Sequence, residues 1–561
     1  MSKSNNKNSN SNKDLSENNN IAIHLPKMAQ AYPDRAAVMF PVKKEYASWT
    51  YKQLDQTADS YAHVMKQAGV HKGQKALVFL HSGPDLIASV FALFKMGVLP
   101  VLLDPGMGRE KMCQCIEHVA PDILIGVREA HIARWFYRQA CRSIKLNFTA
   151  TQWFPGCVNL SKEAVKYNEP FPVMPVAPHE TAAILFTSGS TGKAKGVVYE
   201  HSIFQQQVKY LRELFKFKPG ELDMPGYPLF GLFDIALGMT SVIPRLDPSK
   251  PAECDPALLV DTIEEFNVTT CQGSPIIWRR VCDYCKEDEI KLESLKRVIT
   301  FGAPIPGDLL EELFKVIADE AEIYTPYGAT ESLPVAIIPG TFLVEHAAAR
   351  TVEGAGTCIG KPIAGMEVKI IKITDEPIEK FDEDLVLPDG EVGEIIVHGP
   401  VVTQEYYQED EANKLAKIDD GHGRVWHRMG DTGYFDKDHN LWFCGRKAHR
   451  VETEKGTLFP VMVEGMANNH PRIQRSALVG IGEKGHQKPV LIVQPKSGSF
   501  PEEDKKKDQL SRQILARYDE HELYSQIKDV LYRESFPVDP RHNVKIHREE
   551  LAVWAAEELG Q

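Results

Sequence analysis

The sequence has 561 residues, with 65 Lys and Arg against 77 Asp and Glu, which gives a formal net charge of −12. This acidic balance argues against a nucleic-acid-binding protein, because such proteins carry clustered positive charge. With 43% hydrophobic residues and only ten cysteines, the composition predicts a folded chain of several domain-sized units rather than a disordered or disulfide-stabilised one.

Residues 1–20 are predicted to form a disordered tail, because they are rich in Asn, Ser and Lys and contain no apolar run. For the same reason they do not resemble a secretory signal. The most apolar stretch, at 87–103, is interrupted by Lys95, Gly97 and Pro100 and falls short of the ~20 apolar residues that cross a bilayer. We therefore expect a cytoplasmic protein without a transmembrane segment.

From residue 21 to about 440, short apolar runs alternate with amphipathic stretches. Apolar runs predict buried strands, and apolar residues at helical spacing predict helices between them. Strands alternating with helices indicate α/β layers that contain parallel sheet. The strands are expected at 76–79, 98–103, 122–127 and 182–186, with helices at 82–96 and 204–215.

The pattern changes at residues 355–445, where short strands at 367–373, 393–397 and 441–443 are separated by turns. This predicts a smaller β-rich subdomain. After residue 446, helix and strand units begin again. A strand is expected at 489–494, a solvated loop at the charged run 501–508, and helices within 509–533.

The strongest local signal is a loop of glycines, hydroxyls and lysines directly after the strand at 182–186. Glycines let the backbone approach phosphate oxygens, successive N–H groups bind anions, and lysines add charge. The spacing is not that of a Walker A loop, since Ala194 follows the lysine. The pattern predicts a phosphate-binding loop followed by a helix; the alternative is a flexible surface loop. The loop consists of Thr187, Ser188, Gly189, Ser190, Thr191, Gly192 and Lys193, followed by Ala194, Lys195 and Gly196.

This loop resembles the phosphate-binding motif of the acyl-adenylate-forming superfamily, which includes acyl-CoA synthetases, luciferases and peptide-synthetase adenylation domains. Five further strings resemble motifs of that superfamily and occur in its order, so that the resemblance extends over roughly residues 30 to 555. They are Gly302-Ala303-Pro304, Tyr327-Gly328-Ala329-Thr330-Glu331, Gly430-Asp431-Thr432-Gly433, Gly445-Arg446 and Asn543-Val544-Lys545-Ile546.

The resemblance implies that the protein binds ATP and Mg²⁺. It places Thr330 at the α-phosphate, Glu331 at the Mg²⁺ ion, and Lys545 as a catalytic lysine on a mobile C-terminal domain. These residue types suit a reaction between two anions, in which positioning and charge neutralisation dominate. The remaining nucleotide-binding residues implied are Gly302, Ala303 and Pro304 along adenine, Tyr327 and Gly328 in the next motif, and Asp431 and Arg446 at the ribose.

Taken singly, three of these residues have simpler interpretations. Glu331 could be a carboxylate at a helix start, Asp431 a turn residue, and Lys545 part of an exposed basic cluster.

The pairs Cys282/Cys285 and Cys113/Cys115 have metal-like spacing, but without a partner pair they predict ordinary thiols.

The expected fold is therefore α/β. A large N-terminal AMP-binding domain at 21–445 is built from layered α/β subdomains and the β-rich subdomain at 355–445. A small, mobile α+β domain at 446–561 follows and acts as a lid, with the hinge near Arg446–Ala448.

Four departures from the acyl-CoA synthetase pattern point to one branch of the superfamily. Ala448 stands at the usual hinge position, and Gly231 replaces the histidine of a Pro-Leu-Phe-His motif. The other two are Thr457-Leu458-Phe459-Pro460 after the hinge and Val544 before the catalytic lysine. These departures, together with segments 103–108, 228–239 and 541–555, resemble the β-lactone synthetases of bacterial long-chain olefin biosynthesis (the OleC type).

That branch implies a long-chain 2-alkyl-3-hydroxy fatty acid as substrate. ATP would activate its carboxylate, and its own hydroxyl would then displace AMP to close a β-lactone. Two alternatives stay open: a long-chain acyl-CoA or carrier-protein ligase, and an inactive scaffold within a hydrocarbon-forming assembly. Partner enzymes of such a pathway are possible in each case.

Ring closure requires a group that takes the hydroxyl proton, and Asp234 is the first candidate for this base. The simpler interpretation is that Asp234 caps a helix that starts at Ile235. His449 is the second candidate, with a surface hinge residue as its alternative. An apolar acyl pocket is expected from Phe230, Leu232, Phe233, Met239, Pro275, Ile276, Trp278, Leu333 and Val335.

Overall fold

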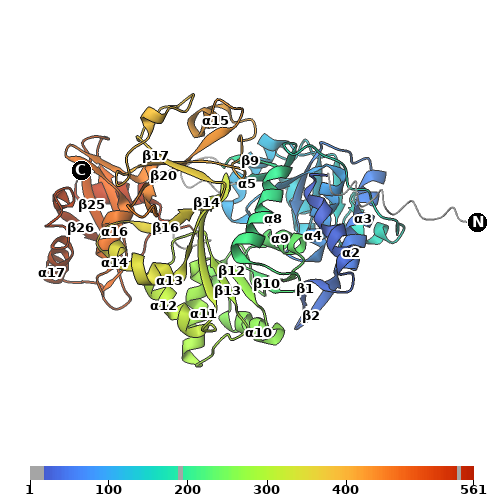
Figure 1. Cartoon of the computed structure of the whole chain (residues 1–561), viewed down its shortest axis with the longest axis horizontal. Helices are drawn as coiled ribbons and strands as arrows, with labels where there is room; N and C mark the ends of the chain where they lie inside the picture. The colour runs from blue at the N-terminus through green and yellow to red at the C-terminus, as the bar shows by residue number, and fades with distance from the viewer. Residues whose placement is uncertain (1–17, 187–193, 540–544, 561) are drawn as a thin grey trace, which may run out of the picture.

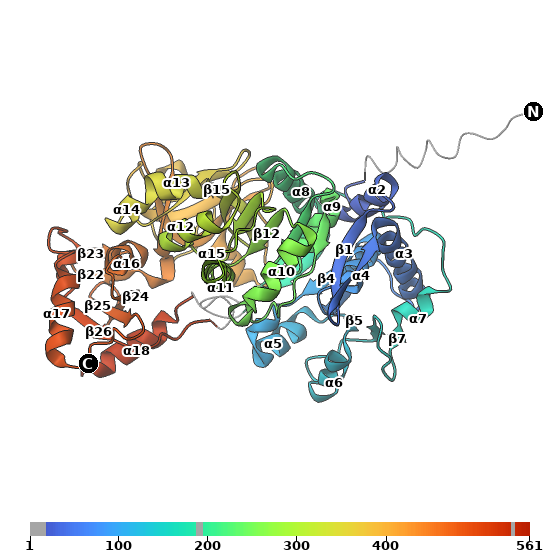
Figure 2. The same cartoon turned by 90° about the horizontal axis from the view of Figure 1, so that it is seen from below.

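The computed structural model describes residues 18–186, 194–539 and 545–560. The N-terminal elements, in blue, and the C-terminal elements, in red, lie at opposite ends of the long axis in both views (Figures 1 and 2). Among the described residues, no helix has the length and apolar character needed to cross a membrane. Of the predicted tail, residues 18–20 are described, and Asn20 is buried, with its amide donating to the carbonyls of Phe94 (2.7 Å) and Met174 (3.0 Å).

The first sheet has seven strands in the order β7-β6-β5-β3-β4-β8-β9. All neighbours are parallel except β8 and β9, which are antiparallel. Parallel strands of this kind are buried on both faces and read as short apolar runs. The strands are β3 (Lys75–Phe79), β4 (Leu99–Leu102), β5 (Ile123–Gly126), β6 (Leu146–Thr149), β7 (Val158–Asn159), β8 (Thr181–Phe186) and β9 (Gly196–Glu200).

The second sheet has fourteen strands, and its parallel centre runs from β1 through β11, β10, β12 and β13 to β14. The centre consists of β1 (Ala36–Val42), β10 (Leu222–Pro225), β11 (Thr240–Val242), β12 (Thr270–Gly273), β13 (Arg297–Thr300) and β14 (Glu322–Ala329). Strand β2 (Glu45–Thr50) pairs antiparallel with β1 at the edge.

The second sheet continues beyond β14 through seven further strands, and the strands expected at 367–373, 393–397 and 441–443 are among them. They pair antiparallel beyond β14, which is typical of sheet built from hairpins and short turns. They are β15 (Ser332–Pro339), β16 (Thr357–Pro362), β17 (Glu367–Ile371), β18 (Gly393–His398), β19 (Lys417–Asp419), β20 (Val425–Phe435) and β21 (Leu441–Arg446).

Helices cover both faces of the second sheet. One core, shared with the first sheet, takes buried side chains from α3 (Tyr51–Gln67), α4 (Pro84–Met96), α8 (His201–Phe215) and α9 (Phe230–Leu237). A second core lies under α10 (Pro256–Phe266), α11 (Pro275–Glu287) and α12 (Gly307–Val316). The predicted α/β layers are therefore confirmed.

The elements after β21 have hydrophobic clusters of their own. A three-stranded sheet packs with helices α16 (Pro460–Asn468), α17 (Asp504–Leu515) and α18 (Arg548–Glu558). Its strands are β24 (Ile473–Ile481), β25 (Lys488–Pro495) and β26 (Asp529–Tyr532).

Three local predictions are wrong. The phosphate loop is followed by strand β9 rather than by a helix, because Val197, Val198 and Tyr199 pair with β8 before α8 begins. The charged run does not stay a loop: α17 starts at Asp504 and buries Leu510 and Ile514. Residues 529–532 form strand β26 instead of a helix.

Candidate active site

Two of the predicted motifs fall partly outside the described residues. Thr187, Ser188, Gly189, Ser190, Thr191, Gly192 and Lys193 are not described, nor are Asn543 and Val544. The strands on either side of the phosphate loop are placed: β8 ends at Phe186 and β9 begins at Gly196.

A buried carboxylate, Asp431, lies at the centre of the predicted ribose site. It sits on β20 directly opposite Arg446 of β21, and the guanidinium donates to its Oδ1 at 2.6 Å. The hydroxyl of Tyr327 on β14 donates to the other oxygen, Oδ2, also at 2.6 Å. Burial raises the pKa of Tyr327 well above its ordinary value, while the charge of Asp431 raises the pKa of Arg446. Asp431 lies within a strand, so its interpretation as a turn residue is wrong.

Thr330 and Glu331 form the turn between β14 and β15. The Glu331 carboxylate accepts a hydrogen bond from the Tyr406 hydroxyl at 2.8 Å, and the Thr330 carbonyl accepts one from Tyr199 at 2.6 Å. The alternative that Glu331 starts a helix is therefore wrong. Sequence reasoning missed both tyrosines, which belong to no motif that we singled out.

The segment Gly302, Ala303 and Pro304 follows the carboxyl end of β13. In open α/β sheets this edge is where ligands bind. Gly302 has φ +88°, a left-handed conformation that favours glycine. The ring of Phe301 lies 4.9 Å from that of Phe230, so the segment is close to the start of α9.

Asp234 lies inside α9, which begins at Phe230, so the prediction that it caps a helix starting at Ile235 is wrong. It is 1% exposed and faces Asp223 of β10 and Ser241 of β11. Burial raises the pKa of Asp234 to about 7 and that of Asp223 well above its ordinary value. Gln272 donates to Asp223 at 2.5 Å, and among the described residues neither carboxyl forms an ion pair. Asp223 was missed, although an acid within an apolar strand was a usable signal.

Gly231 occupies a tight position on the same helix. A Cβ atom there would lie 2.9 Å from the Ser241 hydroxyl oxygen, which is too close for an unstrained contact. The absence of a side chain at the usual histidine position thus lets α9 approach β11 closely, next to the Asp223–Asp234 pair.

The second candidate base, His449, lies away from this acid pair. Its Nε2 atom is 3.5 Å from Glu549 of α18, and burial together with Arg548 lowers its pKa to about 4. Lys545 is exposed, and its carbonyl accepts a hydrogen bond from the Asp539 N–H.

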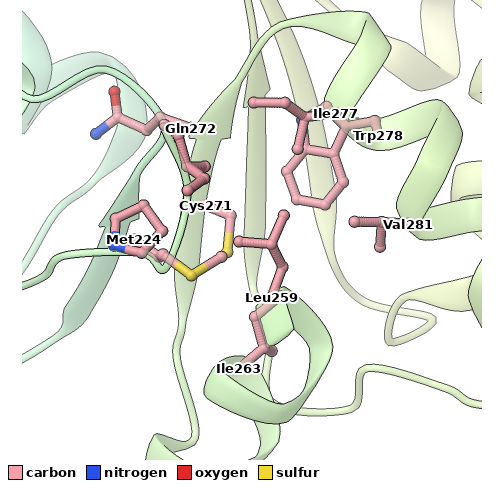
Figure 3. A pocket seen from close by; sticks show the side chains of 11 residues that line it. Met224, Leu259, Ile263, Cys271, Gln272, Ile277, Trp278 and Val281 are labelled. Carbon is pink, nitrogen blue, oxygen red and sulfur yellow. The ribbon is translucent and has the colours of Figure 1, made fainter. Parts of the chain in front are cut away.

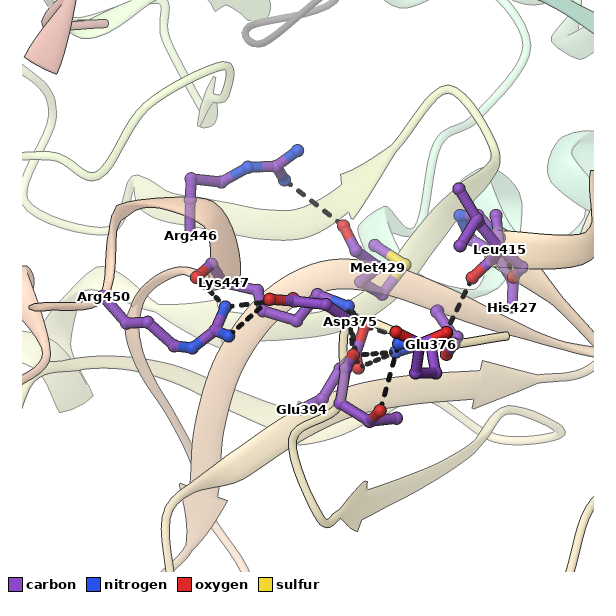
Figure 4. A network of polar contacts seen from close by, with 12 residues as sticks. Asp375, Glu376, Glu394, Leu415, His427, Met429, Arg446, Lys447 and Arg450 are labelled. Carbon is purple, nitrogen blue, oxygen red and sulfur yellow. Dashed lines mark hydrogen bonds and ion pairs between the residues drawn. The ribbon is translucent and has the colours of Figure 1, made fainter. Parts of the chain in front are cut away.

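The residues on both sides of Ala448 form ion pairs with the preceding part of the chain (Figure 4). Before it, the Lys447 ammonium lies 3.1 Å from the fully buried carboxylate of Glu394, which also pairs with Arg428 at 2.6 Å. After it, Arg450 pairs with Asp375 at 2.8 Å. These contacts join the predicted hinge to the strands β18 and β20 and to the loop after β17.

A small, partly open apolar cavity of about 10 Å³ lies between β10, β12, α10 and α11 (Figure 3). Of the side chains predicted to form the acyl pocket, Trp278 lines this cavity. A second cavity of about 10 Å³ adjoins it and shares Gly226, Pro244 and Leu246. Both are dominated by apolar side chains, and each has room for about one water molecule rather than for a long alkyl chain. The first is lined by Met224, Gly226, Pro244, Leu246, Leu259, Ile263, Cys271, Gln272, Ile277, Trp278 and Val281.

The C-x-x-C cysteines, Cys282 and Cys285, are buried within α11. Within the described part of the chain, no group of three or more His, Cys, Asp or Glu side chains could hold a metal ion. The two cysteines therefore contribute to the core of the second sheet, as predicted.

The layered α/β fold and the Tyr327–Asp431–Arg446 arrangement are those expected of an adenylate-forming enzyme. The family model described as AMP-binding enzyme matches residues 25–407, so the chain belongs to this family. The protein is an ATP-dependent acyl-adenylate-forming enzyme, which acts on ATP and an acid, and the predicted superfamily is confirmed.

The chain is 40% identical over 551 residues to the olefin beta-lactone synthetase of Xanthomonas campestris, covering 96% of this chain and 98% of that one. It is also 40% identical over 553 residues to the olefin beta-lactone synthetase of Stenotrophomonas maltophilia, with the same coverage. The resemblance to this branch is therefore confirmed. It supports adenylation coupled to β-lactone formation.

Among solved structures, the amide bond synthetase McbA of Marinactinospora thermotolerans superposes with a TM-score of 0.77 at 19% identity, covering 95% of this chain and 99% of that one. The O-succinylbenzoate CoA synthetase of Bacillus subtilis bound to AMP gives a TM-score of 0.73 at 20% identity, with 94% and 97% covered. At these identities the likeness shows the fold alone.

Proposed function

We propose that the protein converts a long-chain 2-alkyl-3-hydroxy fatty acid into a β-lactone, releasing AMP and pyrophosphate from ATP. The observation that carries this proposal is the 40% identity to olefin beta-lactone synthetases over 96% of the chain. The ordered ATP-binding motifs support it, since an inactive scaffold has no need to keep them.

In the first step, a carboxylate oxygen of the acid attacks the α-phosphorus of ATP, and pyrophosphate leaves. In the second, the hydroxyl oxygen of the same molecule attacks the acyl carbon of the adenylate, AMP leaves, and the hydroxyl proton passes to a base. Because the second attack is intramolecular, it needs orientation rather than a further substrate.

The residues have distinct proposed roles. Asp431 and Arg446 bind the ribose, Thr330 contacts the α-phosphate, and Lys545 brings positive charge to the reacting oxygens. Asp234 is the proposed base, and its pKa of about 7 suits proton transfer near neutral pH. A proton that Asp234 accepts can be shared with Asp223.

Mg²⁺ is the proposed metal. A carboxylate oxygen such as that of Glu331 is a ligand that this hard cation accepts, and Mg²⁺ commonly completes its shell with phosphate oxygens and water. Bound there, Mg²⁺ would neutralise charge on the phosphates. The predicted boundaries at 445 and 446, the mobility of the C-terminal domain, the cytoplasmic location and the partner enzymes stay predictions.

Product analysis tests the proposal. The purified protein is incubated with a 2-alkyl-3-hydroxy acid, ATP and MgCl₂, with and without CoA, and the products are identified by mass spectrometry. We expect a β-lactone in amounts equal to the AMP released, without CoA. A thioester formed only with CoA would instead support the acyl-CoA ligase, and no AMP from any acid would support the scaffold.

A further inference from the structure

Sequence motifs leave unexplained how Glu331 and the second lysine of the phosphate loop, Lys195, can lie near each other without neutralising each other. A carboxylate that holds a cation and an ammonium that attracts phosphate both lose effect if they pair directly. The described residues place one side chain, Tyr406, between the two groups.

Tyr406 contacts the carboxylate with its hydroxyl and the ammonium with its ring. The hydroxyl donates to Glu331 Oε1 at 2.8 Å, and Lys195 Nζ lies 4.8 Å from the ring centroid, within the range of a cation–π contact. The side chain is largely enclosed, at 4% exposed.

The backbone around Tyr406 is anchored on three sides, in a segment that we call the bridging segment (402–407). Val402 forms an antiparallel bridge with Ser332, directly after Glu331, and Tyr406 forms one with Val197 of β9. The Tyr407 N–H donates to the Gly196 carbonyl at 2.7 Å. The bridging segment thus connects the exit of the phosphate loop to the turn that carries Glu331.

Lys417 of β19 supports this segment. It is 9% exposed, its ammonium donates to the Thr403 carbonyl at 2.5 Å, and it lies 5.4 Å from the Tyr406 ring centroid. Thr403 in turn donates its N–H and its hydroxyl to the Glu331 carbonyl, at 2.9 and 3.1 Å. Both the side chain and the backbone of Glu331 are therefore held by residues of the bridging segment.

We propose that Tyr406 is a positioning residue that keeps the Glu331 carboxylate and the Lys195 ammonium apart and directed at a metal-bound triphosphate, with Lys417 and Thr403 as its support. This inference rests on the proposed function of Glu331 as the Mg²⁺ ligand. It predicts that the hydroxyl of Tyr406 affects metal binding and that its ring affects metal-free nucleotide binding.

Two substitutions at this position separate the roles of hydroxyl and ring. Tyr406→Phe removes the hydrogen bond to Glu331 and keeps the ring beneath Lys195, while Tyr406→Leu removes both. Tyr407→Phe is the matched control, because it removes a neighbouring hydroxyl whose partner is Lys75, at 3.0 Å, rather than Glu331. Lys417→Met keeps most of the buried stem and removes the ammonium.

The measurements are ATP affinity by calorimetry, with EDTA and with MgCl₂, and Mn²⁺ affinity by electron paramagnetic resonance in the presence of ATP. For Tyr406→Phe we expect Mn²⁺ affinity to fall about tenfold, as for the loss of one hydrogen bond to a charged group, with metal-free ATP affinity nearly unchanged. Tyr406→Leu should weaken both, and Lys417→Met should weaken Mn²⁺ binding less than Tyr406→Phe does. Thermal unfolding of each variant confirms that it is folded.

The outcomes are distinguishable from failure of the proposed function. If Tyr406→Phe binds Mn²⁺ like the unaltered protein, or loses no more affinity than Tyr407→Phe, the positioning role is wrong. If it weakens metal-free ATP binding as strongly as Mn²⁺ binding, the hydroxyl acts on the whole site and the separation of roles is wrong. If Glu331→Gln leaves Mn²⁺ binding intact, the metal-ligand role itself fails, whatever the result for Tyr406.

Discussion

Two groups of buried acids lie within the same large sheet and have opposite surroundings. On the nucleotide side, Asp431 is held by the Arg446 guanidinium and the Tyr327 hydroxyl, each at 2.6 Å. Under α9, Asp234 and Asp223 face each other, and Gln272 is the neutral donor to Asp223.

The difference shows that a buried carboxyl group behaves differently with a cation beside it and without one. A cation and a hydroxyl offset the cost of burying Asp431, so it can stay an acceptor for sugar hydroxyls. The acids under α9 have no such cation within ion-pair distance among the described residues, and burial pushes their pKa values upward. The surroundings of Asp431 therefore suit an acceptor of hydrogen bonds, and those of Asp223 and Asp234 suit holding a proton.

The largest expected effect comes from removing the positive charge that we propose Lys545 brings to the reacting oxygens. Lys545→Ala should lower the rate of acyl-adenylate formation by about 100-fold or more, the effect of losing a group that stabilises a transition-state charge. ATP affinity should change little. Pyrophosphate exchange measures the rate of adenylate formation, and calorimetry measures ATP affinity. The exposed Lys505→Ala is the control. A loss of ATP affinity as large as the loss of rate would mean that Lys545 binds the ground-state nucleotide instead.

The second-largest effect is expected from breaking the ion pair between Asp431 and Arg446. Arg446→Met leaves Asp431 with only the Tyr327 hydroxyl and removes a donor near the ribose, so ATP affinity should fall by roughly 10- to 100-fold. Calorimetric titration with ATP measures this effect. Arg245→Met, which alters a surface arginine bound to the carbonyls of Lys43 and Lys44, should leave the affinity unchanged. Unaltered ATP affinity in Arg446→Met would remove the arginine from the nucleotide site.

On the proton-holding side, Asp234→Asn should change how stability depends on pH. With a folded-state pKa of about 7 against an ordinary value near 4, the folded protein holds a proton that the unfolded chain releases between these pH values. The contribution of Asp234 to the free energy of unfolding of the unaltered protein therefore falls as pH rises from about 4 to about 7.

The amide of the Asp234→Asn variant cannot ionise, so the stability of the variant relative to the unaltered protein should rise across that window. Urea unfolding at pH 5 and pH 8 measures the gain. The exposed Asp283→Asn on α11 is the control and should show the same difference at both pH values. A constant difference for Asp234→Asn as well would show that its carboxyl is not held protonated.

The smallest effect is expected at Tyr327. Tyr327→Phe removes one of the two donors to Asp431 and leaves the ion pair with Arg446 in place, so ATP affinity should fall only about 3- to 10-fold. Tyr324→Phe, whose hydroxyl donates to Glu322 at 2.5 Å, is the matched control on the same strand. A loss of ATP affinity as large as that in Arg446→Met would mean that the Tyr327 hydroxyl matters as much as the Arg446 guanidinium for the way Asp431 contributes to ATP binding.

The sequence predicted the parts of the fold and site that depend on local pattern. Apolar runs located β3, β5 and β8 to within a residue or two, and short motifs located the chain segments that carry Glu331 and Asp431. These signals are local because a short string of residues both forms the element and carries the functional side chain.

The parts that sequence missed depend on pairing between distant segments. Tyr406 meets Glu331 only because the bridging segment crosses from β9 to the turn after β14, and Asp223 meets Asp234 only because α9 packs on β10. The phosphate loop was predicted to lead into a helix because the pairing of β9 with β8 cannot be read from the residues of β9 alone. Each contact depends on tertiary packing rather than on spacing along the chain.

Isotope transfer tests the central claim, acyl-adenylate formation followed by attack of the hydroxyl, most directly. A 2-alkyl-3-hydroxy acid carrying ¹⁸O in both carboxylate oxygens is converted with ATP, and AMP and product are analysed by mass spectrometry. One ¹⁸O should appear in AMP and the other in the lactone carbonyl. Unlabelled AMP, with both ¹⁸O atoms kept in the lactone, would show that the hydroxyl is the activated group and would contradict the account.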